Sequence, residues 1–350
     1  MNINERIEII SDIGKFLKNY LDEKYDNKKD DNLIEFEKVI KKAQSNNPWF
    51  TDKNIKINLT YWSKKLIKTN LNQWLINYNL KDTFRKNIAI IMAGNIPLVG
   101  FHDFICVFLS GHNSIIKLST NDKYLLPFLL NLMKFPSDRV VYLDGMLKDY
   151  DAVIATGSDN TSRYFEYYFK NKQSIIRKNR NSIAILDGNE TDEDLKSLSH
   201  DILTYFGLGC RSVSKLYVPK DYNFDSFFNS IFGYKGLINN HKYANNYDYN
   251  KAIYLMSEYK FLDNGFFMIK EGSEMHSPIS TINYEYYDNI SHLSEKIKQQ
   301  EENIQCVVSN IKFEGRIDFG ETQNPSLNQY ADNIDAVSYT HLTLPTNREV

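Results

Sequence analysis

The sequence is poor in cysteine, in motifs that bind metals and in net charge. Its three cysteines, Cys106, Cys210 and Cys306, are far apart and odd in number, which argues against a disulfide framework. No Cys-x-x-Cys pair or Cys/His cluster occurs, so we expect no metal site. The formal net charge of −2 gives no electrostatic reason to expect binding to nucleic acid.

Long apolar runs and common nucleotide-binding motifs are also missing. The longest apolar stretch, near residues 104–109, is far too short to span a bilayer, so we expect no membrane span. Acidic and basic residues are mixed from Glu5 onward, unlike a secretion signal. The three cysteines are expected to be reduced thiols, and together with these absences they favour a cytoplasmic location. Neither Gly-x-Gly-x-x-Gly nor Gly-x-x-x-x-Gly-Lys-Ser/Thr is present.

The first 80 or so residues predict helices. Apolar residues from Ile7 to Leu21 lie roughly on one helical face, and a similar pattern runs from Leu33 to Ile40. A charged stretch, 22–31, separates the two as a solvated loop, and the pair Asn47-Pro48 ends the second helix. These helices indicate nothing about chemistry.

From Asn87 the pattern changes to strands that alternate with helices. We expect strands at 87–93, 114–118, 139–143 and 151–155, and helices at 101–109, beyond 121–122 and at 160–169. Such alternation predicts an α/β fold with a doubly wound parallel sheet. Ligands of these sheets bind at the carboxyl ends of the strands, where Asn95, Lys117 and Gly157-Ser158 fall.

Cys210 lies in a glycine-containing segment between a predicted helix, 191–205, and a predicted strand, 215–219. Glycines let the backbone pass close to a ligand and leave the thiol accessible. A lone cysteine in such a turn is more often a small buried apolar residue. The neighbouring Arg211 either lowers the pKa of the thiol or simply faces solvent. Cys106 and Cys306 lie in apolar segments and are expected to be inert packing residues.

Five segments follow one another along the chain: Gly94-Asn95-Ile96-Pro97, Asn113–Ser119, Asp151–Ser158, Gly207–Cys210 and Glu274–Pro278. In this order they resemble five motifs of the aldehyde dehydrogenase superfamily: Asn-Phe-Pro, Asn-Thr-Val-Val-Leu-Lys-Pro-Ser, Phe-Thr-Gly-Ser, Gly-Gln-x-Cys and Glu-Ile-Phe-Gly-Pro. More closely, residues 85–335 resemble the acyl-CoA reductases related to the fatty acid reductase of bacterial bioluminescence.

The resemblance implies a role for each matched residue. Cys210 would be the catalytic nucleophile, and the Asn95 amide would help to form the oxyanion hole. Five residues would bind the cofactor: Lys117, Ser119, Gly157, Ser158 and Glu274, with Lys117 at the adenosine ribose and Glu274 at the nicotinamide ribose. The family implies NADPH rather than NADH, a choice that no residue of this chain decides.

Two positions depart from the superfamily pattern. Members that hydrolyse the acyl-enzyme carry a glutamate as general base in a Glu-Leu-Gly-Gly-Lys segment, and Ile176 occupies that position here. An isoleucine cannot activate water, which disfavours oxidation of an aldehyde to an acid. Leu118 replaces the proline after the strand lysine, which leaves the cofactor contacts less secure.

The predicted reaction is therefore NADPH-dependent reduction of an acyl-CoA to the aldehyde through an acyl-cysteine. Three alternatives remain: an aldehyde-oxidising dehydrogenase, an acyltransferase on the same fold, and a non-catalytic relative that acts as an interaction module. We expect a homo-oligomer, and the acyl group could come from a protein partner. The length of the acyl chain is not encoded in any motif.

The expected domains follow from the same resemblance. A helical region, 1–84, would pack on a dinucleotide-binding domain, 85–205, and a smaller α/β catalytic domain, 206–337, would follow. Residues 338–350 resemble a translated sequencing adapter and are expected to be a non-native tail.

Overall fold

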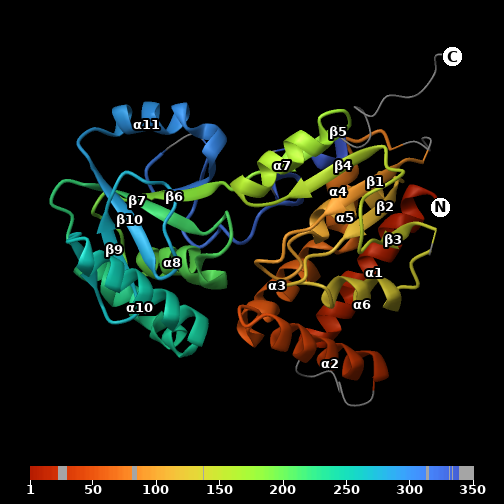
Figure 1. Cartoon of the computed structure of the whole chain (residues 1–350), viewed down its shortest axis with the longest axis horizontal. Coiled ribbons are helices and arrows are strands. Elements are labelled where there is room, and N and C mark those ends of the chain that lie inside the picture. Colours follow the sequence, from red (N-terminus) through yellow and green to blue (C-terminus); the bar gives the residue numbers. More distant parts are fainter. Residues whose placement is uncertain are drawn as a thin grey trace. The chain divides into compact units, whose positions relative to one another are not determined.

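The chain forms two compact units. The computed structural model describes residues 1–22, 30–80, 85–136, 138–312, 315–330, 332 and 334–338. The first unit combines Met1–Lys178 with the segment that begins at Ser326, and the second is Asn179–Pro325 (Figure 1). The expected non-native tail, 338–350, lies outside the described residues apart from Ser338.

The first unit is a five-stranded parallel sheet with helices, in the strand order β3-β2-β1-β4-β5. Its helices are α1 (Ile3–Leu21), α2 (Asp31–Asn46), α3 (Asp52–Lys65), α4 (Lys68–Leu75), α5 (Phe101–Leu109), α6 (Leu125–Leu132) and α7 (Asp159–Phe169). Its strands are β1 (Asn87–Ile91), β2 (Asn113–Lys117), β3 (Val140–Tyr142), β4 (Ala152–Thr156) and β5 (Gln173–Arg177).

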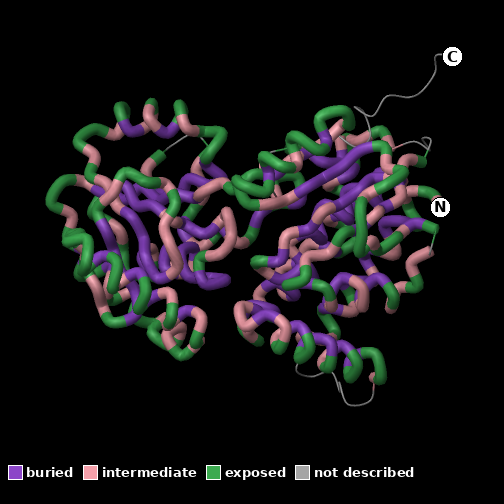
Figure 2. Tube along the Cα trace, in the orientation of Figure 1, coloured by how far each residue is buried: buried purple, intermediate pink, exposed green. Residues whose placement is uncertain are grey.

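Alternate residues of β1 face two different cores. Ile88 and Ile90 pack with α5 in the large core that also contains α1 to α4, whereas Ala89 packs with Phe169 of α7. Because side chains alternate across a strand, α5 and α7 cover opposite faces of the sheet. The central strands are accordingly buried (Figure 2). The predicted doubly wound parallel sheet is confirmed.

The segment after Ser326 belongs to the first unit through buried polar contacts. The Nε2 atom of His102 lies 2.6 Å from the Leu327 carbonyl oxygen, within hydrogen-bond distance. Arg177, which is buried, pairs with Asp103 of α5 at 2.7 Å and with Asp332. These contacts join residues that are far apart in the sequence.

The second unit holds a seven-stranded mixed sheet, in the order β12-β11-β6-β7-β10-β9-β8, in which only the described pair β8–β9 is antiparallel. Its strands are β6 (Asn181–Ile185), β7 (Val213–Pro219), β8 (Phe261–Asp263), β9 (Met268–Glu271), β10 (Thr281–Tyr287), β11 (Ile304–Val308) and β12 (Arg316–Ile317). Its α-helices are α8 (Asp192–Leu203), α9 (Asp225–Ile231), α10 (His241–Met256) and α11 (Ile290–Gln299).

This sheet is also covered on both faces. Ala184 of β6 packs with residues of α8 and α9, whereas Ile183 and Ile185 pack with Leu293 and Ile297 of α11. Short 3₁₀ segments complete the described elements: η2 (Thr204–Gly207), η3 (Phe232–Asn239), η4 (Glu301–Asn303) and η5 (Leu327–Gln329, in the first unit). The second unit is thus an α/β unit, as expected.

The unit boundary differs from the one expected after residue 205. β6 pairs with β7 and β11, so the strand and α8 belong to the second unit. The division therefore falls between Lys178 and Asn179. The functions expected for the domains 1–84, 85–205 and 206–337 stay predictions.

Candidate active site

The turn that carries Asn95 lies just beyond the carboxyl end of β1. Asn95 itself is exposed, and the turn beneath it is held by buried polar groups. Asp122 accepts a hydrogen bond from the Leu98 N–H at 2.7 Å, and Asn47 donates to the Gly94 carbonyl oxygen at 3.3 Å. Leu98 has a φ of +53°, a backbone conformation that this support maintains.

Lys117 and Ser119 lie at the end of the neighbouring strand. Lys117 is the last residue of β2, is exposed, and donates to the Gly145 carbonyl oxygen at 3.3 Å. The Ser119 hydroxyl accepts from the Asn121 N–H at 3.2 Å. A Cβ on Gly94 would lie 2.5 Å from Ser119 Oγ, so a glycine is required where these two strand ends approach each other.

Gly157 and Ser158 join β4 to α7. Ser158 is the N-cap of α7, and its hydroxyl accepts from the Thr161 N–H at 3.4 Å. A Cβ on Gly157 would lie 3.0 Å from side-chain atoms of Thr161 and Phe165, so the glycine lets the chain turn tightly into the helix. Backbone N–H groups at a helix N-terminus favour phosphate groups.

The first unit therefore gathers five predicted residues at one edge of its sheet. Because β2, β1 and β4 are adjacent and parallel, their carboxyl ends lie side by side. Ile176 is on the neighbouring strand β5, where it pairs with Ala155 of β4. The next residue, Arg177, is the buried cation that binds Asp103 and Asp332.

Cys210 belongs to the second unit, in the loop that leads into β7. It is half-buried, whereas Cys106 and Cys306 are buried. Three consecutive residues just before the loop, Tyr205, Phe206 and Gly207, have φ values of +55°, +59° and +75°. Such left-handed conformations are rare for residues other than glycine, so the surrounding structure must hold the chain here. α8 stops at Leu203 instead of the predicted residue 205, because the backbone of Thr204 is already extended, with a ψ of 138°.

Polar contacts brace both sides of the cysteine. The Ser182 hydroxyl of β6 donates to the Cys210 carbonyl oxygen at 2.9 Å. Arg211 is half-buried and its Nε donates to the Thr322 carbonyl oxygen at 2.5 Å. Arg211 thus has a definite partner in the protein and does not simply face solvent.

Asp201 of α8 supports the segment that Arg211 binds, and the sequence analysis did not identify it. The fully buried carboxylate accepts from the Gly320 N–H at 2.6 Å, the Thr322 N–H at 3.0 Å and the Thr322 hydroxyl at 2.7 Å. Burial raises the pKa of Asp201 to about 6, although these hydrogen bonds lower it. The sequence signal that could have identified Asp201 is its position next to Leu198 and Ile202, on the apolar face of the predicted helix.

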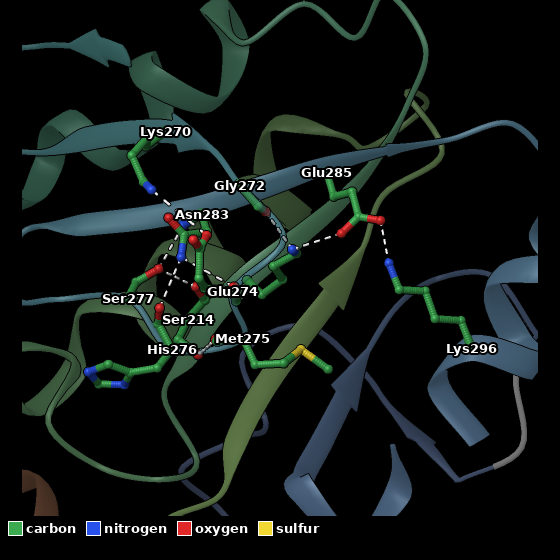
Figure 3. A network of polar contacts seen from close by, with 11 residues as sticks. Ser214, Lys270, Gly272, Glu274, Met275, His276, Ser277, Asn283, Glu285 and Lys296 are labelled. Atoms are coloured by element: carbon green, nitrogen blue, oxygen red, sulfur yellow. Dashed lines mark hydrogen bonds and ion pairs between the residues drawn. The ribbon is translucent and has the colours of Figure 1, made fainter. Parts of the chain in front are cut away.

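Glu274 lies in the loop between β9 and β10. Its side chain is 63% exposed, and its carboxylate lies 3.8 Å from the Lys270 ammonium. The main chain of this loop is bound by the side chains of Ser214 and Asn283 (Figure 3) and by that of Lys215. These three residues were also missed, because no local pattern marks them. Within the second unit, the loop of Glu274 is thus joined to the strand that follows Cys210.

The remaining candidates give no second site. Burial raises the pKa of both Cys106 and Cys306. In the part of the chain that the structure describes, no three His, Cys, Asp or Glu residues are grouped to hold a metal ion. No helix among the described residues combines the length and apolar character needed to cross a membrane.

Similar solved structures are aldehyde dehydrogenases. Aldehyde dehydrogenase 21 from Physcomitrella patens, with the reaction product succinate, gives a TM-score of 0.64 at 12% identity, covering 98% of this chain and 85% of that chain. The gamma-glutamyl-gamma-aminobutyraldehyde dehydrogenase of Burkholderia cenocepacia gives a TM-score of 0.64 at 12% identity, covering 88% of this chain and 72% of that chain. The NAD+ complex of an aldehyde dehydrogenase from Bacillus cereus gives a TM-score of 0.61 at 12% identity, again covering 88% of this chain and 72% of that chain.

At this level of identity the likeness establishes the fold, which is that of the aldehyde dehydrogenases, as the sequence motifs predicted. A comparison with curated proteins finds no match. Residues 3–227, more than half of the chain, match the family described as Acyl-CoA reductase (LuxC). The chain belongs to this acyl-CoA reductase family.

Proposed function

We propose that the chain reduces a fatty acyl-CoA to the aldehyde, with NADPH as the reductant and an acyl-cysteine on Cys210 as the intermediate. Membership of the acyl-CoA reductase family supports this reaction. The observation that carries it is the contrast between the cysteines: Cys210 is half-buried in a braced loop, whereas Cys106 and Cys306 are buried. A nucleophilic thiol must reach its substrate, and Cys210 best meets that requirement.

In this mechanism the Cys210 thiolate attacks the thioester carbonyl carbon, and the thiolate of coenzyme A leaves. NADPH, when bound, supplies a hydride to the acyl carbon. The resulting thiohemiacetal on Cys210 then collapses, which releases the aldehyde and restores the cysteine. The oxyanion role of Asn95 stays a prediction, and its exposed position at the strand end is compatible with a contact to a ligand.

The residues of the first unit fit a dinucleotide. The tight turn at Gly157 opens a helix whose first N–H groups suit phosphate, and Lys117 presents an exposed ammonium at the same sheet edge. The NAD+ complex of the similar Bacillus cereus enzyme supports a nicotinamide cofactor. The choice of NADPH over NADH comes from the family resemblance, as do the roles of Ser119, Ser158 and Glu274.

Reduction is favoured over hydrolysis because of Ile176. The position holds a half-buried isoleucine on β5, with no group that could take a proton from water. An acyl-cysteine that does not meet an activated water survives until hydride reaches it. A homo-oligomeric state, a protein that supplies the acyl group and a cytoplasmic location stay predictions.

The decisive experiment follows NADPH consumption with acyl-CoAs of graded chain length, in the wild type and in Cys210→Ala. We expect the variant to lose activity by at least about 1000-fold, because no other group replaces the nucleophile. Cys306→Ala is the matched control, since it removes a buried thiol of the same unit. It should keep most of the activity.

A second measurement traps the intermediate. Radiolabelled acyl-CoA without NADPH should label the wild type and Cys306→Ala but not Cys210→Ala, and the label should persist over minutes. NADPH consumption by Cys210→Ala at the wild-type rate would rule out the covalent mechanism. Rapid release of labelled fatty acid would instead favour the hydrolytic alternative.

A further inference from the structure

Lys215 is a buried cation with no assigned role in the reaction. It is the third residue of β7, and its exposed fraction is 0%. Its ammonium donates to the Gly272 carbonyl oxygen at 2.6 Å and lies 3.0 Å from the Glu285 carboxylate. Lysine is almost never fully buried without such partners. Because an apolar residue would fill a buried strand position at lower cost, stability alone is a weak reason for this lysine.

The partners of Lys215 show what it holds. Gly272 begins the loop 272–278, in which Glu274 lies. The second partner, Glu285, also binds Lys296 of α11, so its carboxylate is fixed between two cations. Burial alone would raise the pKa of Glu285, but hydrogen bonds from Lys296 and Lys215 lower it overall. The carboxylate is therefore ionised at neutral pH and anchors the Lys215 ammonium beneath Gly272.

The rest of the loop is bound to the same two strands, β7 and β10 (Figure 3). On the β7 side, Ser214 Oγ donates to the Met275 carbonyl oxygen at 2.8 Å, and Ser277 Oγ donates to the Ser214 carbonyl oxygen at 2.6 Å. On the β10 side, Asn283 Nδ2 donates to the carbonyl oxygens of Glu274, at 3.2 Å, and His276, at 2.9 Å. The Asn283 N–H donates to Ser277 Oγ at 2.7 Å.

This arrangement fixes the backbone of the loop but leaves the Glu274 side chain accessible. The Glu274 side chain is 63% exposed, and its ion pair with Lys270 is long, at 3.8 Å. A rigid backbone that presents an exposed carboxylate suits the recognition of ribose hydroxyls, because little freedom remains to be lost on binding. The support also starts close to the nucleophile, since Ser214 and Lys215 follow Cys210 by four and five residues on the same segment.

We propose that Lys215 is a positioning residue, which holds the loop 272–278 so that Glu274 receives the nicotinamide ribose at a fixed place relative to the Cys210 loop. The inference rests on the proposed function, because it takes from it the cofactor and the role of Glu274. It adds the residue that sets the geometry. Lys215 acts through the loop and touches neither the cofactor nor the acyl group.

The test compares Lys215→Met with Lys296→Met. Methionine keeps the length and apolar character of the buried stem and removes the ammonium. Lys296→Met removes the outer partner of the same carboxylate and leaves the Lys215–Gly272 bond intact. We expect Lys215→Met to raise the Kd of NADPH, from fluorescence titration, and its KM by roughly 10-fold, as misplacement of a binding group does. Acylation of Cys210 without NADPH should stay within about 2-fold of the wild type.

Lys296→Met should bind NADPH within about 2-fold of the wild type. Unchanged NADPH binding by Lys215→Met would overturn the proposal, because Lys215 would then not position the cofactor. A loss of acylation as large as the loss of NADPH affinity would also overturn it, because it would indicate a purely structural role. Should Lys215→Met fail to fold in urea and circular dichroism measurements, Ser214→Ala decides instead. It deletes the hydroxyl that binds Met275, and wild-type NADPH affinity in that variant would then reject the proposal.

The two proposals can fail separately. A wild type that binds NADPH but does not reduce acyl-CoA contradicts the proposed function, while the Kd values of the variants still decide the role of Lys215. A wild type that binds neither NADPH nor NADH contradicts both.

Discussion

The candidate residues of the two units are held in place in different ways. In the first unit, Ser119 and Ser158 bond to residues two and three positions away, and Lys117 bonds to one 28 positions away. In the second unit, the Cys210 and Glu274 loops depend on partners that are remote in the sequence. Arg211 and Thr322 are 111 residues apart, and Lys215 and Gly272 are 57 apart.

The difference separates two ways of building a site. A parallel sheet places its strand ends side by side through backbone pairing, so Ser119 and Ser158 need only local contacts. The Asn95 turn is supported by the buried side chains of Asp122 and Asn47. The Cys210 and Glu274 loops of the second unit are fixed by polar side chains from distant positions, among them the buried Lys215 and the half-buried Arg211. We therefore expect stability and ligand binding to be separable in the first unit and coupled in the second.

The largest effect on the free energy of unfolding is expected for Asp201→Ala. The substitution leaves the Gly320 N–H, the Thr322 N–H and the Thr322 hydroxyl without their acceptor. Buried donors that lose their acceptor cost about 1–3 kcal/mol each, so we expect a loss of roughly 3 kcal/mol in urea denaturation. Acylation of Cys210 should slow in the same variant, because Arg211 binds the displaced segment.

Glu193→Gln is the control for Asp201→Ala on the same helix. Glu193 has a side chain that is 84% exposed, and its substitution should change stability by less than about 0.5 kcal/mol. A fall in stability after Asp201→Ala with an unchanged acylation rate would break the proposed coupling in the second unit.

Asp122→Asn tests the buried carboxyl group that supports the Asn95 turn. Burial raises the pKa of Asp122 to about 7, although the Leu98 N–H bond lowers it, and the Oδ1 atom has no hydrogen-bond partner among the described residues. The pKa in the folded state thus exceeds that of an unfolded aspartate, about 4. Its contribution to stability is fully present below pH 4 and is lost as the pH rises through 7.

Between pH 5 and pH 8 this group should cost the wild type on the order of 2 kcal/mol of stability. The asparagine side chain in the variant cannot ionise but keeps an oxygen for the Leu98 N–H, so the variant should show a smaller loss in urea denaturation at the two pH values. Asp144→Asn, an exposed substitution in the same unit, should keep the wild-type pH dependence. Equal pH dependence in Asp122→Asn and the wild type would contradict the shifted pKa.

The smallest effect on stability is expected for Lys117→Met. Lys117 is exposed and makes one long bond to Gly145, so the free energy of unfolding should change by less than about 0.5 kcal/mol. The Kd of NADPH should rise by about 10- to 100-fold, the usual cost of a lost charged hydrogen bond. Lys148→Met controls for the loss of a surface charge. Equal weakening in both variants would mean that general charge, and not a specific contact, binds the cofactor.

The sequence predicted the first unit better than the second because its signals are local. The strand ends near Asn95 and Lys117 follow from apolar runs that stop at turn residues, and the predicted helix 101–109 agrees with α5. β5 was not predicted, because its five residues, Gln-Ser-Ile-Ile-Arg, include only two apolar ones and give no clear strand pattern.

The support of the second unit could not be predicted, for physical reasons. Lys215 stands between Ser214 and Leu216 in β7 and would be placed at the surface by its charge alone. Its partners are Gly272, just after β9, and Glu285 of β10, both more than 50 positions later. Asp201 similarly depends on residues more than 100 positions away. The left-handed residues Tyr205 and Phe206 carry no signal, since neither residue type favours that conformation.

The return of the segment after Ser326 to the first unit makes the second unit an insertion within the first. During synthesis on a ribosome, Asn179–Pro325 emerges completely before Leu327 can reach His102, 225 positions earlier. The second unit can therefore acquire its own cores while the first still lacks Asp332 beside Arg177. Closure of the first unit then becomes the late event of folding, because it needs contacts between residues that are far apart in the sequence.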